Sequence, residues 1–208
     1  MQITSYINFL NQQEEILNEL NSNTNSLGVM IQIEESNLIG YQNQLDNFLS
    51  LVKTKKKIIF NFLPLKDDTT MNYEQKKINR EVYIGKFYNI LSKYQYLSLY
   101  LCSSEFHFLF LFREWGFGKI GLVIEENNYN YLDVDFYVLP TSRLDINIIT
   151  EQLSLNKEIM IEISNEQELV LVRNFLLQYS GVKALNEVQF IISDKFYQIM
   201  KNNQNYAL

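Results

Sequence analysis

Hydrophobic residues recur with a seven-residue spacing over residues 3–52. Twelve of the fifteen positions at the two core sites of this heptad are apolar, and no insertion interrupts the spacing. Such a repeat keeps one apolar seam turned toward a partner helix. It predicts either one long coiled-coil helix or a hairpin of helices 3–20 and 27–53, with the polar run 21–26 as the turn. The seam residues expected to bind a partner are Leu10, Leu17, Leu20, Leu27, Ile31, Leu38, Tyr41, Leu45 and Phe48.

Beyond residue 94 the apolar pattern changes to a period of two. Strands rich in aromatic and β-branched residues are predicted at 94–101, 106–112, 119–124 and 131–139. The links between them are short, which favours an antiparallel meander. Flanking strands are expected at 58–63, 158–163 and 188–192. Helices are expected at 73–92, from the cap at Ser164 or Asn165 to Gly181, and from Asp194 onward.

These elements predict an α+β fold, with a mostly antiparallel sheet of about four meander strands plus flanking strands packed against helices. Two units are expected: an acidic helical hairpin or coiled coil over residues 1–55, and an α+β globular domain over residues 56–208. A chain of 208 residues with 47% hydrophobic residues can bury such a core.

The net charge of −6 lies entirely in the N-terminal segment. Residues 1–52 contain six acids and no Lys or Arg, whereas the remaining chain carries 18 charges of each sign. Phosphate contacts require cations, so direct nucleic-acid binding by this segment is excluded. A basic protein partner is favoured instead, and self-association through the seam remains an alternative. The acidic residues expected at that contact are Glu14, Glu15, Glu19, Glu34 and Glu35.

The sequence carries no signal for export or membrane insertion. The longest apolar runs are too short to span a bilayer, and the N-terminus lacks the features of a signal peptide. One Cys excludes an internal disulfide framework. A cytoplasmic protein is expected.

Residues 116–123 match the glycine-rich pattern GxGxxGxV of protein kinases. The remaining kinase motifs are missing, and the final glycine opens a strand rather than the helix that dinucleotide binding requires. A turn in which glycines supply unusual backbone angles explains the pattern better. Trp115, beside this turn, is interpreted either as a lid over the end of the sheet or as an exposed contact residue.

The remaining candidate chemistry is sparse. His107 and Cys102 alone cannot make a four-ligand zinc site, and the predicted strands place them on opposite faces. Asp133 and Asp135 share one strand face and, with His107, form a candidate site for Mg²⁺ or Mn²⁺. No lysine accompanies them in a nuclease-like arrangement, so a solvated strand face is the preferred interpretation. No metal, cofactor or catalytic residue is assigned.

The pattern therefore favours a non-enzymatic assembly subunit that docks into a multiprotein complex through its acidic N-terminal helices. One alternative is an inhibitor or immunity-type protein that covers a basic site. Another is a metal-dependent hydrolase that uses Asp133, Asp135 and His107.

Overall fold

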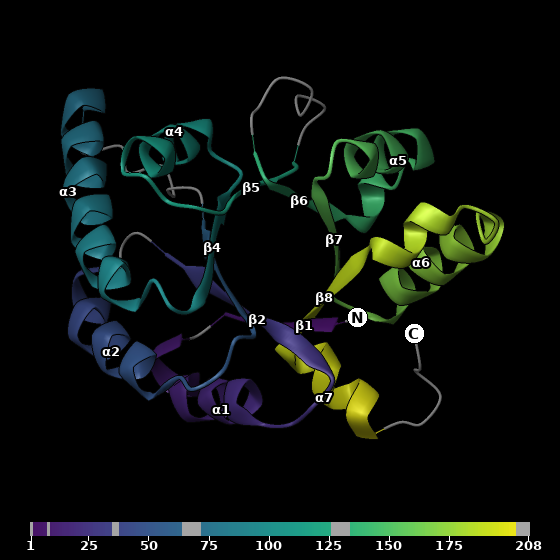
Figure 1. The fold of residues 1–208 in the computed structure, drawn as a ribbon, viewed down its shortest axis with the longest axis horizontal. Coiled ribbons are helices and arrows are strands. Elements are labelled where there is room, and N and C mark those ends of the chain that lie inside the picture. Colours follow the sequence, from purple (N-terminus) through teal and green to yellow (C-terminus); the bar gives the residue numbers. More distant parts are fainter. Residues whose placement is uncertain (1, 8, 35–37, 64–71, 126–133, 203–208) are drawn as a thin grey trace.

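Eight parallel strands form a closed barrel in the computed structural model, and helices surround them (Figure 1). The structure describes residues 2–7, 9–34, 38–63, 72–125 and 134–202. The strands are β1 (Gln2–Tyr6), β2 (Ser26–Ile33), β3 (Lys57–Phe62), β4 (Ser98–Ser103), β5 (Ile120–Val123), β6 (Phe136–Pro140), β7 (Glu158–Ile163) and β8 (Gln189–Ser193). Each strand pairs in parallel with the next, and β1 closes the barrel on β8.

Helices follow most of the strands, as parallel connections require. They are α1 (Phe9–Asn21), α2 (Leu38–Leu51), α3 (Tyr73–Leu91), α4 (Phe106–Glu114), α5 (Ile146–Ser154), α6 (Glu166–Gln178) and α7 (Asp194–Asn202), with short 3-10 turns η2 (Ser92–Tyr94), η4 (Thr141–Arg143) and η5 (Lys183–Glu187). The β5–β6 connection has no helix in its described residues, 124, 125, 134 and 135. This arrangement is a (β/α)₈ barrel that lacks regular helix in the described part of one connection.

Two apolar layers hold the barrel together. Alternate strand residues point outward and pack against the helices in one large core. The other strand residues fill the interior, and they are Ile3, Met30, Ile59, Tyr100, Cys102, Phe136, Val138, Met160 and Ile191. Both faces of each strand are therefore buried, which explains why these strands carry near-continuous apolar runs.

The predicted α+β fold with an antiparallel meander is wrong. Residues 106–112, predicted as a strand, belong to α4, and the three remaining strands of the region, β4, β5 and β6, pair in parallel. Six of the seven residues in the run Phe106–Phe112 are apolar, so the run fits the period of two of a strand as well as the apolar stripe of a helix. Phe108, Leu109, Leu111 and Phe112 are buried, whereas Phe110 is 63% exposed. In so short an apolar run, the pattern of apolar positions does not distinguish a strand from a helix.

The predicted helical hairpin or coiled coil over residues 1–55 is also wrong. This segment forms β1, α1, β2 and α2, and its strands pair with β8 and β3 of the remaining chain. The buried face of α1 is Phe9, Ile16 and Leu20, so the helix places Leu10 partly at the surface. Strands buried on both faces carry near-continuous apolar runs, so their apolar residues fit a heptad in more than one frame. The seven-residue spacing therefore combines the apolar stripes of helices α1 and α2 with the apolar residues of strands β1 and β2.

The outer helices confirm several local predictions. Residues 73–92 are helical, and α3 begins with a capping box between Asn72 and Gln75. Asn165 caps α6 through the backbone N–H of Glu168. Strands β3, β7 and β8 and helix α7 lie where the sequence predicted them. None of the helices in the described ranges is long and apolar enough to cross a membrane.

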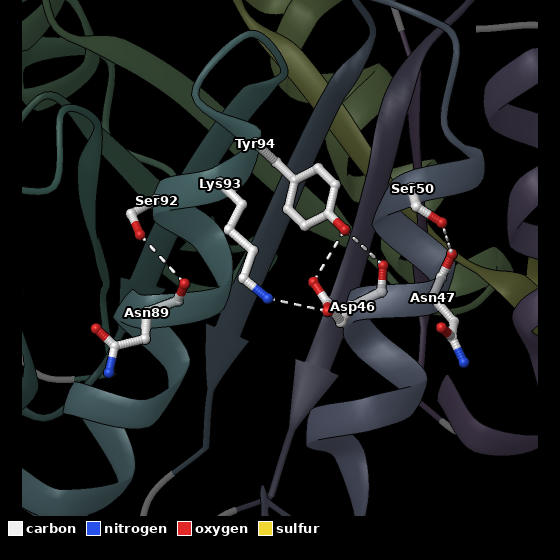
Figure 2. Close-up of polar contacts among 7 residues, drawn as sticks. All are labelled: Asp46, Asn47, Ser50, Asn89, Ser92, Lys93 and Tyr94. Carbon is white, nitrogen blue, oxygen red and sulfur yellow. Dashed lines mark hydrogen bonds and ion pairs between the residues drawn. The ribbon is translucent and has the colours of Figure 1, made fainter.

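A polar contact joins α2 to the turn after α3 (Figure 2). The Tyr94 hydroxyl donates to the Asp46 carboxylate at 2.9 Å and contacts the Asp46 carbonyl oxygen at 2.8 Å, and Lys93 Nζ lies 3.0 Å from the same carboxylate. These hydrogen bonds lower the pKa of Asp46. They position η2 and, through it, the start of β4.

Candidate active site at the carboxyl end of the barrel

Polar side chains replace the apolar filling at the carboxyl ends of several strands. Strand alternation places Ser5, Gln32, Asn61 and Glu162 inward, two residues beyond Ile3, Met30, Ile59 and Met160 of the apolar interior. Gln32, Asn61 and Cys102 occupy neighbouring register positions on β2, β3 and β4 and therefore point the same way. In (β/α)₈ enzymes the catalytic groups come from this end of the strands.

Glu162 is the inward-facing carboxyl group near the end of β7. Burial raises its pKa, and the neighbouring Glu168 carboxylate raises it further. Glu168 is itself held in place, because one of its carboxylate oxygens accepts the Ser164 backbone N–H at 2.7 Å. A carboxyl group with a raised pKa can give or take a proton closer to neutral pH than an ordinary glutamate.

Two small inward-facing side chains at this end of the barrel differ in what they can contribute. Ser5 is 2% exposed, and its hydroxyl has no hydrogen-bond partner among the described residues. A buried hydroxyl without a partner is unfavourable unless something else fills its place. Cys102 is completely buried, and burial raises its thiol pKa, with an added effect of the negative charge of Glu162. The thiol therefore stays protonated and is a poor nucleophile.

The inward-facing strand residues described at this end include no Lys, Arg or His. Amide and hydroxyl groups from Asn61, Gln32 and Ser5 supply hydrogen bonds without charge. Within the described ranges, no group of three or more His, Cys, Asp or Glu is arranged to hold a metal ion. The arrangement suits a neutral polar ligand and a single proton-transferring carboxyl group.

The amino-terminal end of the barrel is polar in a different way. Lys57 at the start of β3 forms an ion pair with Glu158 at the start of β7, and its Nζ also donates to Gln189 Oε1 at 3.1 Å. The Tyr100 hydroxyl donates to Glu158 at 3.3 Å. These four side chains are all hydrogen-bonded to one another or ion-paired, as in a polar network that stabilises the end of the barrel.

The described residues of the predicted metal site lie on different elements. His107 lies on α4 rather than on a strand, and Asp133 lies outside the described residues. Asp135 precedes β6, where its carboxylate accepts the Ile120 backbone N–H at 2.9 Å and lies 3.3 Å from an Arg113 nitrogen. Asp135 therefore joins β6 to β5 and α4.

The predicted partner-binding residues have varied positions. Leu20, Ile31, Tyr41, Leu45 and Phe48 are buried in the core of the chain, Leu17 and Leu27 are half-buried, and Leu10 is 38% exposed. Glu14 and Glu15 are exposed on α1, and Glu19 and Glu34 are half-buried. No side-chain placement is described for Leu38, and Glu35 lies outside the described residues. Contact of the exposed members with a partner stays a prediction.

Sequence reasoning missed Glu162, Asn61, Gln32 and Ser5. A signal was present for the first two, because each is a polar residue near the end of a buried strand. In parallel folds this position leads into the next connection. In the predicted antiparallel sheet, the carboxyl ends of neighbouring strands lie at opposite edges. Residues at these ends were therefore not considered together as one site.

Comparison with solved structures supports the fold. A protein assigned as a glycerophosphoryl diester phosphodiesterase from Silicibacter pomeroyi DSS-3 superposes with a TM-score of 0.52 and 9% identity, over 72% of this chain and 52% of that one. This chain thus spans about half the length of that protein. A protein with the same assignment from Agrobacterium tumefaciens str. C58 gives a TM-score of 0.45 and 7% identity, over 78% and 65% of the two chains. D-psicose 3-epimerase gives 0.48 and 6%, over 92% and 84%.

No family model matches this sequence, and no curated protein sequence does. The fold still corrects the predicted function. A non-enzymatic assembly subunit that docks through separate acidic N-terminal helices is wrong, because those residues form β1, α1, β2 and α2 of the barrel itself. The inhibitor and metal-dependent hydrolase alternatives depended on the same incorrect fold and are withdrawn.

Proposed function

We propose that this protein is an enzyme that transfers protons on a small, uncharged molecule bearing hydroxyl groups. Its site is the carboxyl end of the barrel, and Glu162 is the general acid–base. The observation that carries the proposal is a half-buried, inward-facing carboxyl group with a raised pKa near the end of a barrel strand. Perturbed carboxyl groups are concentrated at catalytic sites, although structural networks also produce them.

The neighbouring groups support a neutral substrate. Asn61 and Gln32 are able to donate and accept hydrogen bonds, and Ser5 is a buried hydroxyl that a ligand hydroxyl would satisfy. The phosphodiester chemistry named for the Silicibacter protein has less support here. A phosphodiester is negatively charged, and the described inward-facing residues present a carboxyl group without a neighbouring cation. A cytoplasmic location remains part of this proposal, supported by the buried Cys102 thiol.

The test combines binding and turnover. The protein would be incubated in ²H₂O with a panel of neutral aldoses, ketoses and their O-glycosides, and proton NMR would follow both bond cleavage and deuterium incorporation. At least one compound should react, and Glu162→Gln should slow that reaction by about a hundredfold or more. Glu166→Gln, an exposed change on α6, should leave the rate unchanged.

Two results would contradict the proposal. One is a panel in which no compound binds or reacts while sugar phosphates do bind. The other is full activity in Glu162→Gln, which would place the chemistry elsewhere in the molecule.

A further inference from the structure

A cavity lies at the opposite, amino-terminal end of the barrel. It measures about 510 Å³ and is bounded by the end of α3, by η2, by the start of β4 and by the loop from α4 to β5. Its lining includes Tyr88, Ser92, Ser98, Tyr100, Phe117 and Lys119. This size falls within the range of sites that bind small molecules. It is separate from the candidate site around Glu162.

The outer wall of the cavity is aromatic and held in place by packing. The Tyr88 ring lies 5.4 Å from the Trp115 ring and 5.3 Å from the Phe117 ring, measured between centroids. The Trp115 ring packs so closely on α3 that a Cβ atom at Gly85 would lie 3.1 Å from it. The loop after α4 is therefore fixed against α3. Aromatic walls of this kind favour a planar apolar ligand body.

The glycine-rich loop contributes open space to this cavity. Gly116 and Gly118 both line it, and a Cβ atom built at either residue would meet nothing within 4 Å. Gly116 has a φ of 75°, which non-glycine residues rarely adopt. The pattern that resembled a phosphate loop is thus a turn that borders a cavity.

The inner wall supplies neutral hydroxyl groups. Ser98 and Tyr100 are inward-facing residues of β4, and Ser98 lies beside Lys57 in the strand register. The Tyr100 hydroxyl is engaged with Glu158, whose charge is balanced by Lys57. Burial, followed by the negative charge of Glu158, raises the pKa of Tyr100 to about 12. Tyr100 therefore remains uncharged and does not repel an anion.

The described residues that line the cavity include one cation and no acid. Lys119 is exposed and lines the cavity. Lys53, Lys55 and Lys183 are exposed on other loops at the same end of the barrel. Of these four lysines only Lys119 lines the cavity, so it is the one placed to attract a ligand of opposite charge there. One lysine in the lining suits a ligand with a single negative charge.

We propose that this cavity binds a small aromatic carboxylate, with its planar body against Tyr88 and Phe117 and its carboxylate toward Lys119. The proposal is independent of the chemistry at Glu162, because it depends on residues at the other end of the barrel.

A matched pair of probes tests the charge requirement. 1-Naphthoate and its neutral amide, 1-naphthamide, have nearly the same shape and differ in charge. Each would be titrated into the ¹⁵N-labelled full chain, and the backbone amides of residues 92–100 and 116–119 would be followed with the Trp115 indole N–H. Both probes should bind there, with naphthoate about threefold to fivefold tighter, as expected for a partly exposed ion pair.

Three variants separate the parts of the proposal. Lys119→Gln should remove the preference for naphthoate and leave the affinity for naphthamide unchanged. Lys183→Gln, which removes an exposed lysine that does not line the cavity, should keep the preference. Ser92→Phe should fill the cavity and weaken both probes. Circular dichroism would show that each variant retains the fold.

The proposal would be overturned by equal affinities of the two probes for the wild-type chain, or by an unchanged preference in Lys119→Gln. Shifts confined to residues outside the cavity, or no saturable binding at all, would also reject it.

Discussion

Lys57 and Glu158 form an ion pair between β3 and β7 at the amino-terminal opening of the barrel. Gln189 contacts both partners, and the Lys57 ammonium lies 5.0 Å from the centroid of the Tyr100 ring. The two charged side chains are 18% and 28% exposed, so water screens the pair only in part. Four strands are therefore joined by one polar layer beneath the apolar interior.

Removing one partner of this pair should destabilise the barrel. Lys57→Met leaves Glu158 charged and partly buried, and we expect the free energy of unfolding to fall by about 2 kcal/mol. Urea denaturation at neutral pH measures the change. The double variant Lys57→Met with Glu158→Met should recover part of the loss, because no unpaired charge remains. A single variant as stable as the wild type would contradict the structural role.

Gly28 should be intolerant of any side chain. A Cβ atom at this position in β2 would lie 2.0 Å from the Lys57 carbonyl oxygen. Since that oxygen belongs to the neighbouring strand, Gly28→Ala should force β2 and β3 apart and cost about 3 kcal/mol. Gly118→Ala is the matched control, because its Cβ would meet nothing within 4 Å, and it should change stability by less than about 0.5 kcal/mol. Similar losses in both variants would show that the close approach is not the cause.

The pH dependence of stability should report the burial of Glu162. Its pKa is raised above the ordinary value of 4.5, so the folded state holds the proton more tightly than the unfolded state does. The free energy of unfolding of the wild type therefore falls as the pH rises from 4.5 to the raised pKa of Glu162 in the folded state. Above that pKa, Glu162 causes no further loss of stability. Glu162→Gln should be more stable than the wild type at pH 7 and equally stable at acidic pH. Urea midpoints at several pH values measure this, and a constant difference would contradict it.

Asp46 should show the opposite pH dependence. Hydrogen bonds from Lys93 and Tyr94 lower its pKa, so its stabilising effect is present above the ordinary value of 3.8 and is lost as pH falls through the lowered pKa. Asp46→Asn should lower the thermal midpoint at pH 7, and this difference should vanish near about pH 2. Because the group is exposed, the effect should also shrink in high salt. An equal deficit at both pH values would assign it to lost packing.

The sequence predicted helix caps and short buried strands correctly where residues close together in the chain determine them. The Asn165 side chain and the backbone of Glu168 are three residues apart, so their cap forms whatever the surrounding fold is. The buried strands β3, β7 and β8 are short apolar runs bounded by polar residues or proline, and they were found for the same reason. Neither feature depends on which strands become neighbours.

The candidate site was not readable in the same way. Glu162 acquires its raised pKa from burial and from Glu168, and its inward direction depends on how β7 pairs with β6 and β8. The charge of Glu162 also acts on Cys102, which is 60 residues away in the chain and lies on β4. Only a closed barrel brings these positions together.

The sequence by itself determined where α3, α6 and α7 begin, the buried strands β3, β7 and β8, and the acidic character of residues 1–52. The tertiary structure decided that the strands are parallel, that residues 106–114 are helical and that the barrel closes between β1 and β8. The physical reason is that helix caps and apolar runs act within a few residues. Strand direction and closure, by contrast, depend on hydrogen bonds between segments as distant as Gln2 and Phe190.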